Sequence, residues 1–355
     1  MTQPQNQVVK ILAAGKADIV DVEIPKLPAS DYILVKTTAV AINPTDWKHV
    51  DFADAISCVG TWVGCDYAGV VEEVGPGVTK QFQKGDRICG PVNGCNGVRK
   101  IDGSFAKYIV VKGDLQIKIP DNLTDEEAAT LGIAVTTVGQ GLYQNLKLPL
   151  PDAPATEPFF IFIYGGSTAM GTFGIQYAKL SGATVVTTSS PHNFDYLKSL
   201  GADAVFDYNS PTVVDDIRSF TNNSLKLAWD CMSTEESSIL IAKTLRTEGG
   251  HIGTLLSVDQ SKISQVNANV KAELSLYYTV FGEPFTYFGA KPGDQEAYKF
   301  GKHFWELSRK LLEEGKVKPT RTYKNRGGDG LQGVLVGLQE SKENKVSGGK
   351  LVYTL

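Results

Sequence analysis

Residues 159–171 read FFIFIYGGSTAMG, and this stretch decides the fold class. The apolar residues 159–163 predict a buried strand, and the glycines after them predict a tight turn into a helix over residues 172–180. A strand, a glycine turn and a helix in direct succession place backbone N–H groups and a positive helix end where a pyrophosphate can bind. The sequence therefore predicts a dinucleotide site at Gly166, Ser167, Thr168 and Ala169.

The glycine pattern is imperfect when taken alone. In a G-x-G-x-x-G alignment, Gly166 and Gly171 fill the outer places and Thr168 replaces the middle glycine, so an ordinary strand-to-helix turn is the alternative. The residues that follow favour the dinucleotide interpretation, because apolar strands alternate with amphipathic helices. This alternation predicts an α/β fold with a doubly wound parallel sheet covered on both faces. The strands are expected at 183–188, 204–208, 225–230 and 251–256, and the helices at 193–200, 213–220 and 234–245.

Length and charge exclude several classes of protein. The chain has 355 residues, more than one domain usually holds, so two domains are expected. Its net charge of −4, with scattered Lys and Arg, gives no electrostatic footprint for nucleic acid. No apolar run reaches membrane-spanning length, and residues 1–10 lack a signal-peptide core. We therefore expect a cytoplasmic protein that binds neither nucleic acid nor a membrane.

The cysteines and histidines do not indicate a metal site. The five cysteines include no C-x-x-C pair, so reduced, buried thiols are expected. None of the four histidines stands at metal-ligand spacing from another candidate ligand. The protein is expected to be metal-free.

The chain before the glycine turn is rich in short strands, expected at 8–13, 19–22, 32–42, 65–74, 87–90 and 104–111. Asp86 and Arg87 are expected to form an ion pair where one of these strands begins. After the nucleotide sheet, a long helix over 295–314 and a strand over 350–355 are expected to return to the first domain. The expected domains are a discontinuous β-rich domain, 1–130 with 290–355, and a nucleotide-binding domain, 131–289.

Five short motifs follow one another in a characteristic order, at 41–46, 64–71, 74–78, 85–88 and 200–203. On these motifs the chain resembles the medium-chain dehydrogenase/reductase superfamily. The resemblance implies an oxidoreductase with a GroES-like β-rich domain and a Rossmann domain.

The chain differs from the zinc-containing members of that superfamily, and the differences indicate which branch of the superfamily it resembles. Zinc alcohol dehydrogenases carry a ligand cysteine in the early loop, a Gly-His-Glu segment and a four-cysteine lobe. Here the early loop reads Asn-Pro-Thr-Asp at 43–46, Gly-Cys-Asp at 64–66 replaces Gly-His-Glu, and the lobe is missing. Without a Lewis acid to stabilise an alkoxide, alcohol oxidation is disfavoured. The resemblance is thus to the zinc-free branch, which reduces activated C=C bonds.

A narrower similarity lies in residues 189–195, SSPHNFD, and residues 198–203, KSLGAD. Together with 43–48 and 165–168, these residues resemble the fungal trans-acting enoyl reductases that serve iterative polyketide synthases, the lovastatin-pathway type being the best known. The resemblance implies reduction of an enoyl thioester carried on the acyl-carrier domain of a partner synthase.

The end of the second strand indicates NADPH as the cofactor. NAD-preferring folds place Asp or Glu there to bind the ribose 2′-hydroxyl. Here hydroxyl residues and a lysine follow the strand, which suits a 2′-phosphate. A solvated helix residue is the alternative for the lysine. The residues expected at this end are Ser189, Ser190, Pro191, His192 and Lys198, and by resemblance Tyr208.

The family pattern supplies the remaining cofactor contacts. Thr45, Asp46, Trp47 and Lys48 are expected on the nicotinamide side. Leu255 and Leu256 are expected to flank the nicotinamide, although core packing accounts equally well for that pair. Val346 and Ser347 are expected to close over the nicotinamide.

Lys48 is the leading catalytic candidate. Hydride transfer to Cβ of an enoyl thioester leaves negative charge on the thioester oxygen, which needs hydrogen-bond donors, and Cα needs a proton. Lys48 is the one cation in the family's active-site loop, so it is expected to bind that oxygen or to supply the proton. A surface lysine at a turn is the alternative.

Two apolar stretches are expected to line the substrate pocket, because a polyketide chain is mostly hydrocarbon. An edge strand that pairs two subunits is the alternative for the second stretch, but the proline at 284 disfavours pairing, so a monomer is expected. The first stretch is Leu131, Gly132, Ile133, Ala134, Val135, Thr136, Thr137 and Val138, and the second is Ser275, Leu276, Tyr277, Tyr278 and Thr279.

Two other functions stay open at this point. One is a free-standing NADPH quinone or alkenal reductase. The other is an NADPH-binding structural or regulatory protein that has lost catalysis, for which the missing middle glycine at Thr168 gives slight support.

Overall fold

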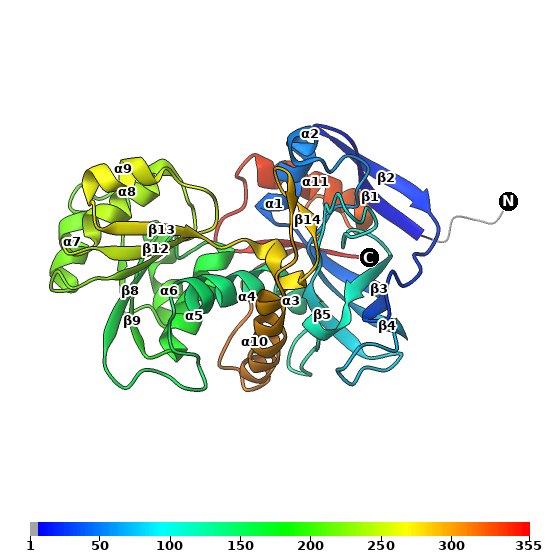
Figure 1. Cartoon of the computed structure of the whole chain (residues 1–355), viewed down its shortest axis with the longest axis horizontal. Helices are drawn as coiled ribbons and strands as arrows, with labels where there is room; N and C mark the ends of the chain where they lie inside the picture. The colour runs from blue at the N-terminus through cyan, green and yellow to red at the C-terminus, as the bar shows by residue number, and fades with distance from the viewer. Residues whose placement is uncertain (1–5) are drawn as a thin grey trace. The chain divides into compact units, whose positions relative to one another are not determined.

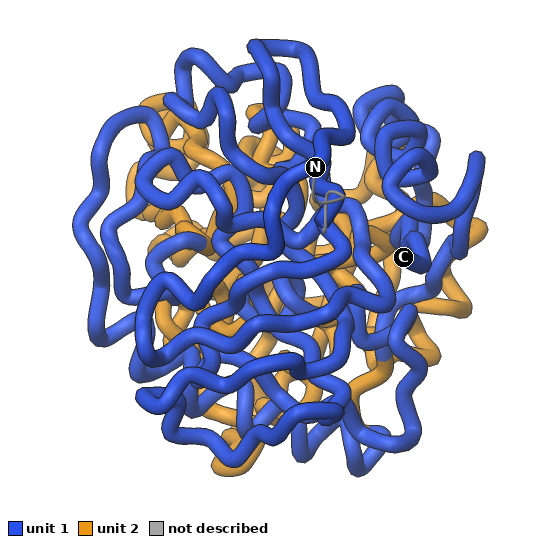
Figure 2. The backbone as a smooth tube through the Cα atoms, turned by 90° about the vertical axis from the view of Figure 1, so that its right-hand side faces the viewer, with its two compact units in different colours: residues 1–136, 278–315, 319–355 blue, residues 137–277, 316–318 orange. Residues whose placement is uncertain are grey.

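The structure, a computed structural model, describes residues 6–355 and divides into two compact units. Unit 1 comprises the described residues up to Thr136 together with 278–315 and 319–355, and unit 2 comprises residues 137–277 and 316–318 (Figure 2). These divisions follow Thr136 and Tyr277, whereas the expected functional domains divide after residues 130 and 289.

Unit 2 is built on a six-stranded parallel sheet (Figure 1). The strand order is β10-β9-β8-β11-β12-β13. Strands are added on one side of β8 up to β10 and on its other side from β11 onward, so the switch point, where doubly wound sheets bind ligands, lies between β8 and β11. The α/β class expected from the sequence is confirmed. The strands are β8 (Phe159–Tyr164), β9 (Ala183–Thr188), β10 (Ala204–Phe206), β11 (Leu227–Asp230), β12 (Gly250–Thr254) and β13 (Val270–Leu274).

Both faces of this sheet are covered, which is why its strands are apolar rather than alternating. Neighbouring residues of β11 show the two faces: Trp229 lies against glycines of α5 and η2, while Ala228 belongs to a core cluster that includes Ile217 of α7 and Ile241 of α8. The helices are η2 (Gly139–Asn145), α5 (Ala169–Leu180), η3 (Pro191–Asn193), α6 (Phe194–Ser199), α7 (Val213–Phe220), α8 (Glu235–Thr244) and α9 (Gln260–Val266).

Unit 1 holds a mostly antiparallel sheet of order β16-β17-β3-β4-β5-β7, in which β6 also pairs with β3. The last strand of the chain, β17, pairs with β3, so residues from both ends of the sequence share one sheet. Two separate hairpins, β1-β2 and β14-β15, complete its strands. The bounds are β1 (Asn6–Ala13), β2 (Lys16–Val22), β3 (Tyr32–Ala41), β4 (Asp66–Val74), β5 (Arg87–Pro91), β6 (Tyr108–Lys112), β7 (Ile117–Lys118), β14 (Phe285–Thr286), β15 (Ala290–Lys291), β16 (Thr322–Lys324) and β17 (Lys350–Thr354).

The helices of unit 1 pack where small residues allow close approach. On α11, a Cβ at Gly333 or Gly337 would come within 2.7 Å of the Tyr353 ring of β17, so the two glycines let the helix lie on the sheet. On α10, one face of the helix is buried, including Phe304 and Trp305. The helices are α1 (Pro44–Asp51), α2 (Ala53–Ile56), η1 (Gly113–Leu115), α3 (Asp125–Ala128), α4 (Gly132–Val138, which runs into unit 2), η4 (Tyr277–Phe281, which begins in unit 2), α10 (Gln295–Glu313) and α11 (Gly330–Lys342).

One alternative and one expectation from the sequence are wrong. Tyr277 and Tyr278 belong to no edge strand: they begin the 3₁₀ helix η4, and the edge strand β13 ends at Leu274. Asp86 and Arg87 do not pair with each other, because Asp86 binds Lys118 at 2.8 Å and the Arg87 guanidinium binds Asp125 at 2.6 Å. Lys118 lies in β7 and Asp125 begins α3, so each of the two residues has its partner on another segment.

Over residues 6–355, no helix combines the length and the apolar character needed to span a bilayer.

Candidate active site

The turn after β8 in unit 2 leads directly into the N-terminus of α5. Gly165 adopts φ +78°, and Thr168 caps α5, its Oγ1 accepting the N–H of Gly171 at 2.9 Å. A Cβ at Gly171 would lie 2.3 Å from the carbonyl oxygen of Gly165, and a Cβ at Gly166 would lie 2.2 Å from Thr187 Oγ1. Each outer glycine of the motif is therefore required by packing, and the middle place holds the helix cap.

The ends of β9 and β10 bring two of the predicted adenosine-side residues together. Ser190 Oγ lies 3.2 Å from the hydroxyl of Tyr208, and the Tyr208 ring lies 6.5 Å from the ring of Tyr164 at the end of β8. Tyr164 was not predicted, although its place directly before the glycine turn is a usable signal. These three residues form one half-exposed group at the carboxyl edge of the sheet.

The other residues predicted beside them differ in exposure. Ser189 is buried, and its hydroxyl has no hydrogen-bond partner among the described residues. Pro191, His192 and Lys198 are exposed, on η3 and α6. The structure thus offers hydroxyls and an exposed lysine near the end of β9, but it brings only Ser190 into contact with Tyr208.

Leu255 and Leu256 follow β12 rather than end it, and both are half-buried. The N–H of Leu255 donates to Ser233 Oγ at 2.8 Å. Ser233 in turn is held by Asp230, the last residue of β11, whose carboxylate accepts the Ser233 N–H at 2.8 Å and the Ser237 hydroxyl at 2.6 Å. Burial raises the pKa of Asp230, and the hydrogen bonds from these serines oppose the rise. This network positions the loop after β12, and sequence reasoning missed it.

In unit 1, α1 carries the four residues predicted on the nicotinamide side. Thr45, Trp47 and Lys48 are half-buried, and Asp46 is fully buried. Asp46 Oδ2 accepts the N–H of Asn43 at 2.7 Å in a capping box, which orients the first turn of the helix.

Asp46 has a strongly perturbed carboxyl group. Burial raises its pKa to about 8; the hydrogen bond from Asn43 opposes the rise, and the charge of Asp66 adds to it. The carboxyl is therefore mostly protonated at neutral pH. Asp46 acts in the fold as a neutral capping group and not as a fixed negative charge.

The side-chain amine of Lys48 lies beside an aromatic ring and is half-buried. Its Nζ lies 5.7 Å from the centroid of the Trp47 ring, and burial lowers its pKa. A lowered pKa makes an ammonium group a better proton donor near neutral pH.

A buried ion pair lies beside α1 and was not predicted. Asp66 at the start of β4 is 0% exposed and binds Lys350 of β17, which is 3% exposed. Asp66 Oδ2 also accepts the Asn43 side-chain amide at 3.0 Å, and Oδ1 accepts the N–H of Ile133 at 2.6 Å. The pair thereby joins β4 and β17 to the residue before α1 and to the start of α4.

Thr45 belongs to a second group that sequence reasoning missed. Its Oγ1 lies 3.1 Å from His49 Nδ1 and 3.1 Å from the hydroxyl of Tyr278, which itself lies 3.2 Å from His49 Nε2. His49 Nδ1 is also 2.8 Å from the carbonyl oxygen of Thr45. A carbonyl only accepts, so Nδ1 carries the proton and Nε2 accepts from Tyr278. Burial lowers the pKa of His49, which keeps this ring neutral.

The first predicted substrate stretch is buried throughout. Thr136 Oγ1 accepts the indole N–H of Trp305 at 3.1 Å, and a Cβ at Gly132 would lie 2.5 Å from Asp66 Oδ1. Residues 131–136 belong to unit 1, and 137 and 138 belong to unit 2. The stretch consists of Leu131 and the whole of α4.

The second predicted stretch leads into η4. Ser275, Leu276 and Tyr277 belong to unit 2, where Asn145 Nδ2 donates to Ser275 Oγ at 3.0 Å, and Tyr278 and Thr279 belong to unit 1. Val346 and Ser347 are the pair expected to close over the nicotinamide. Val346 packs against the core of unit 1, while Ser347 is exposed and its carbonyl accepts the Tyr323 hydroxyl at 2.7 Å.

The described residues contain no group of three or more His, Cys, Asp or Glu side chains arranged to hold a metal ion. All five cysteines are buried as free thiols, and burial raises the pKa of the Cys65 thiol, which stands where zinc enzymes of the superfamily have histidine.

Comparison with known proteins places this architecture. A family model described as the alcohol dehydrogenase GroES-like domain matches residues 29–121, and one described as zinc-binding dehydrogenase matches residues 169–290. Among solved structures, CurK enoyl reductase has a TM-score of 0.76 at 18% identity and covers 99% of both chains. A quinone oxidoreductase of Pseudomonas syringae has a TM-score of 0.76 at 19% identity and covers 99% of this chain and 100% of its own. These likenesses show the fold.

Sequence relatives are much closer. Trans-enoyl reductase TOXD of Cochliobolus carbonum is 54% identical over 263 residues, which cover 74% of this chain and 86% of that protein. Trans-enoyl reductase resD of Aspergillus sclerotiorum is 42% identical over 98% of this chain and 99% of its own length. The resemblance seen in the motifs is confirmed: the chain belongs to the trans-enoyl reductase family within the medium-chain dehydrogenase/reductase superfamily.

Proposed function

We propose that this protein is an NADPH-dependent enoyl reductase that acts in trans, reducing the α,β-double bond of an enoyl thioester carried by an iterative polyketide synthase. The observation that carries the proposal is the 42% identity to a trans-enoyl reductase over nearly the entire chain. The enzymatic class follows from it: an oxidoreductase that acts on C=C bonds.

The glycine turn of unit 2 fits a dinucleotide. Gly166 and Gly171 leave no room for side chains, and the twelve-residue helix α5 directs its positive end at the turn. Gly166, Ser167, Thr168 and Ala169 would hold the pyrophosphate, and Ser190 with Tyr208 would face the adenosine. When bound, the reduced nicotinamide supplies the hydride.

We favour NADPH over NADH because no carboxylate stands at residues 188–192, directly after β9. Ser189 and Ser190 would donate hydrogen bonds to a 2′-phosphate, and Lys198 would add a positive charge.

The residues of α1 would act on the substrate. Lys48 would donate a hydrogen bond to the thioester oxygen, or a proton to Cα, as its lowered pKa allows. Protonated Asp46 and the Thr45 hydroxyl would position the cofactor side of the site. The apolar residues 131–138 and 275–279 would contact the hydrocarbon chain. Metal-independence, a monomeric state and a cytosolic location belong to the same proposal.

The experiment is a comparison of acceptors. Purified protein is given NADPH with a short enoyl thioester, with a simple quinone or with an alkenal, and NADPH consumption is followed. Turnover of the thioester well above the quinone and the alkenal supports the proposal. The reverse preference favours a quinone or alkenal reductase, to which the fold is equally suited. Tight NADPH binding with no turnover of any acceptor indicates a protein that has lost catalysis.

A further inference from the structure

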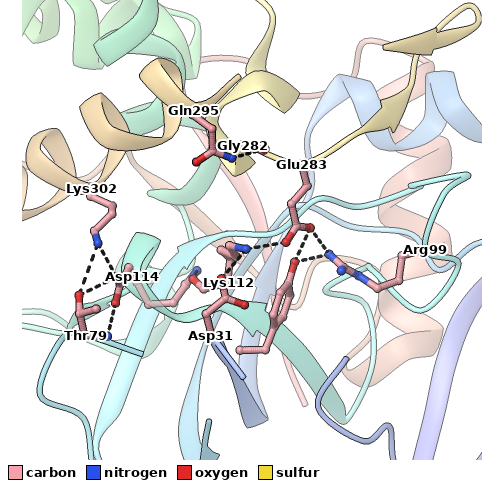
Figure 3. Close-up of polar contacts among 11 residues, drawn as sticks. Asp31, Thr79, Arg99, Lys112, Asp114, Gly282, Glu283, Gln295 and Lys302 are labelled. Atoms are coloured by element: carbon pink, nitrogen blue, oxygen red, sulfur yellow. Dashed lines mark hydrogen bonds and ion pairs between the residues drawn. The ribbon is translucent and has the colours of Figure 1, made fainter. Parts of the chain in front are cut away.

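The segment that follows η4 is held at one point by a carboxylate. Residues 282–293 run from Gly282 through the hairpin β14-β15 and back, and the two ends meet: a Cβ at Gly293 would lie 2.2 Å from the carbonyl oxygen of Gly282. Gln295 Nε2 donates to that same carbonyl at 2.7 Å. Glu283 stands at the base of this closed loop, directly after Gly282 (Figure 3).

Glu283 has three partners from three other segments of unit 1. Its Oε2 accepts the Tyr32 hydroxyl of β3 at 2.7 Å and the Arg99 guanidinium at 2.7 Å, and its Oε1 binds Lys112 of β6 (Figure 3). Both cations also lie over the Tyr32 ring, at 4.5 Å for Arg99 and 5.1 Å for Lys112. The side chain of Glu283 is 23% exposed and that of Lys112 is 9% exposed, so the cluster is largely shielded from water.

The cluster favours an ionised Glu283. Burial works to raise the pKa of this carboxyl, but hydrogen bonds from Lys112 and Tyr32, with the charge of Arg99, outweigh burial and lower the pKa. Asp31 and Asp102 share the same cations, at 2.7 Å from Lys112 and 2.8 Å from Arg99. Without the Glu283 charge, Lys112 would still be paired with Asp31 and Arg99 with Asp102, so only the loop would lose its anchor.

The loop carries aromatic side chains that pack against Tyr278, whose hydroxyl contacts Thr45. The Tyr278 ring lies 5.7 Å from Phe285 and 5.8 Å from Tyr287, and His49 lies 5.8 Å from Tyr278. Glu283 thus stands between η4, which carries Tyr278, and β14, which carries Phe285. Through the Tyr278 hydroxyl, which lies 3.1 Å from Thr45 Oγ1, this segment reaches the Thr45 side chain.

We propose that Glu283 is a positioning residue: its clamp on Tyr32, Arg99 and Lys112 holds residues 278–291 so that Tyr278 orients Thr45 for the reaction. This inference rests on the proposed reductase function, in which Thr45 approaches the nicotinamide. Glu283 touches neither cofactor nor substrate and acts through Tyr278.

Unit 1 offers a matched control in Asp114. Its carboxylate also binds a lysine, Lys302 of α10, and accepts the N–H of Thr79 at 2.8 Å (Figure 3). Asp114 anchors the turn at residues 79–80 and not the loop. A purely structural role for both carboxylates predicts equal consequences for activity when either is neutralised.

The experiment compares Glu283→Gln, Glu283→Asp and Asp114→Asn in the full-length protein. Backbone amide exchange is measured over residues 278–291 and over 79–80, and kcat and KM are measured with NADPH and a short enoyl thioester. Glu283→Gln should speed exchange in the loop alone and lower kcat/KM roughly ten- to a hundredfold, since small displacements near a reacting group have that effect. Asp114→Asn should speed exchange at 79–80 and leave kcat/KM unchanged. Glu283→Asp should recover part of the loss.

A double variant separates positioning from general damage. In a Tyr278→Phe background, Glu283→Gln should cause little further loss of kcat/KM, because the two changes break one linkage. Unchanged amide exchange over residues 278–291 in Glu283→Gln would overturn the clamp. If the fold-loss of kcat/KM in the double variant equals the product of the two single losses, Glu283 does not act through Tyr278. Should the wild-type protein turn over no enoyl thioester, the proposed function fails, while the exchange comparison still decides the clamp.

Discussion

The two units differ in how far apart in sequence the residues of their candidate sites lie. In unit 2, the residues that form the glycine turn lie within a single run, from Tyr164 to Gly171, and the neighbouring strand ends at Ser190 and Tyr208 follow in order along the chain. In unit 1, each polar group joins residues far apart in sequence: Asp66 binds Lys350, and Thr45 binds Tyr278.

The difference teaches that local patterns are sufficient for a cofactor turn, but not for a catalytic surface. A phosphate site of this kind is backbone geometry, which glycines and helix caps encode locally. The surface around α1 depends on side chains brought together by the antiparallel sheet, and its stability should respond to single distant substitutions.

The largest effect is expected from breaking the buried pair of unit 1. Lys350→Met leaves Asp66 buried without its cation, which should cost about 3–5 kcal/mol of unfolding free energy. Lys118→Met, which removes an ion pair whose lysine side chain is 49% exposed, should cost about 0–1 kcal/mol. Urea unfolding of both variants makes the comparison, and equal costs would show that the Asp66–Lys350 pair does not hold unit 1 together.

Lys48→Met should lower kcat/KM for an enoyl thioester by roughly a hundredfold, the usual contribution of a positioned proton donor. Lys299→Met is the control, because that lysine is 69% exposed and its ion pair is with Glu296 of its own helix. Steady-state kinetics decide the matter, and an unaltered kcat/KM in Lys48→Met removes this residue from the chemistry.

Gly171→Ala tests whether the glycine turn of unit 2 forms the cofactor site. The added Cβ would meet the Gly165 carbonyl at 2.3 Å, so overpacking of about 1–3 kcal/mol should weaken NADPH binding roughly ten- to a hundredfold. Gly174→Ala lies in the same helix and meets the Trp229 ring at 2.5 Å, away from the turn. It should lower Tm and spare the Kd measured by calorimetry; similar losses of affinity in both would mean that general damage to α5 explains them.

Ser190→Asp should change cofactor preference. A carboxylate beside Tyr208 would repel a 2′-phosphate and accept a ribose hydroxyl, so the NADPH-to-NADH affinity ratio should fall by about tenfold. Lys198→Ala should move the ratio in the same direction. A ratio near one already in the wild-type protein contradicts the NADPH assignment.

A further expected effect is a dependence of stability on pH. Because the folded protein holds the pKa of Asp46 at about 8, above the ordinary 3.8, the folded state binds the proton more tightly, and stability falls as pH rises through that interval. Asp46→Asn resembles the protonated form and should flatten the fall. Tm measured from pH 5 to 8 tests this, and parallel curves for the two proteins would contradict it.

The sequence predicted the parts of the molecule that local patterns encode. Strand, turn and helix around Gly166 were found because hydrophobic period and glycine spacing are visible within a dozen residues. His49 was missed because a lone histidine on a short helix gives no signal until Tyr278 is brought beside it. The same holds for Glu283, whose partners Tyr32, Arg99 and Lys112 stand more than 170 residues away.

The Asp86–Arg87 pairing failed for a related reason. Adjacent charges are conspicuous in a sequence, but their partners here, Lys118 and Asp125, come from segments that only the fold brings near.

The central claim is that this chain passes a hydride from NADPH to the β-carbon of an enoyl group presented on a carrier domain. The direct measurement uses NADPH deuterated at the nicotinamide C4 and an enoyl thioester loaded on an acyl-carrier domain, with the product analysed by mass spectrometry and NMR. The account predicts a saturated product with one deuterium at Cβ. Saturated product without deuterium, or deuterium recovered only in a reduced quinone, would contradict it.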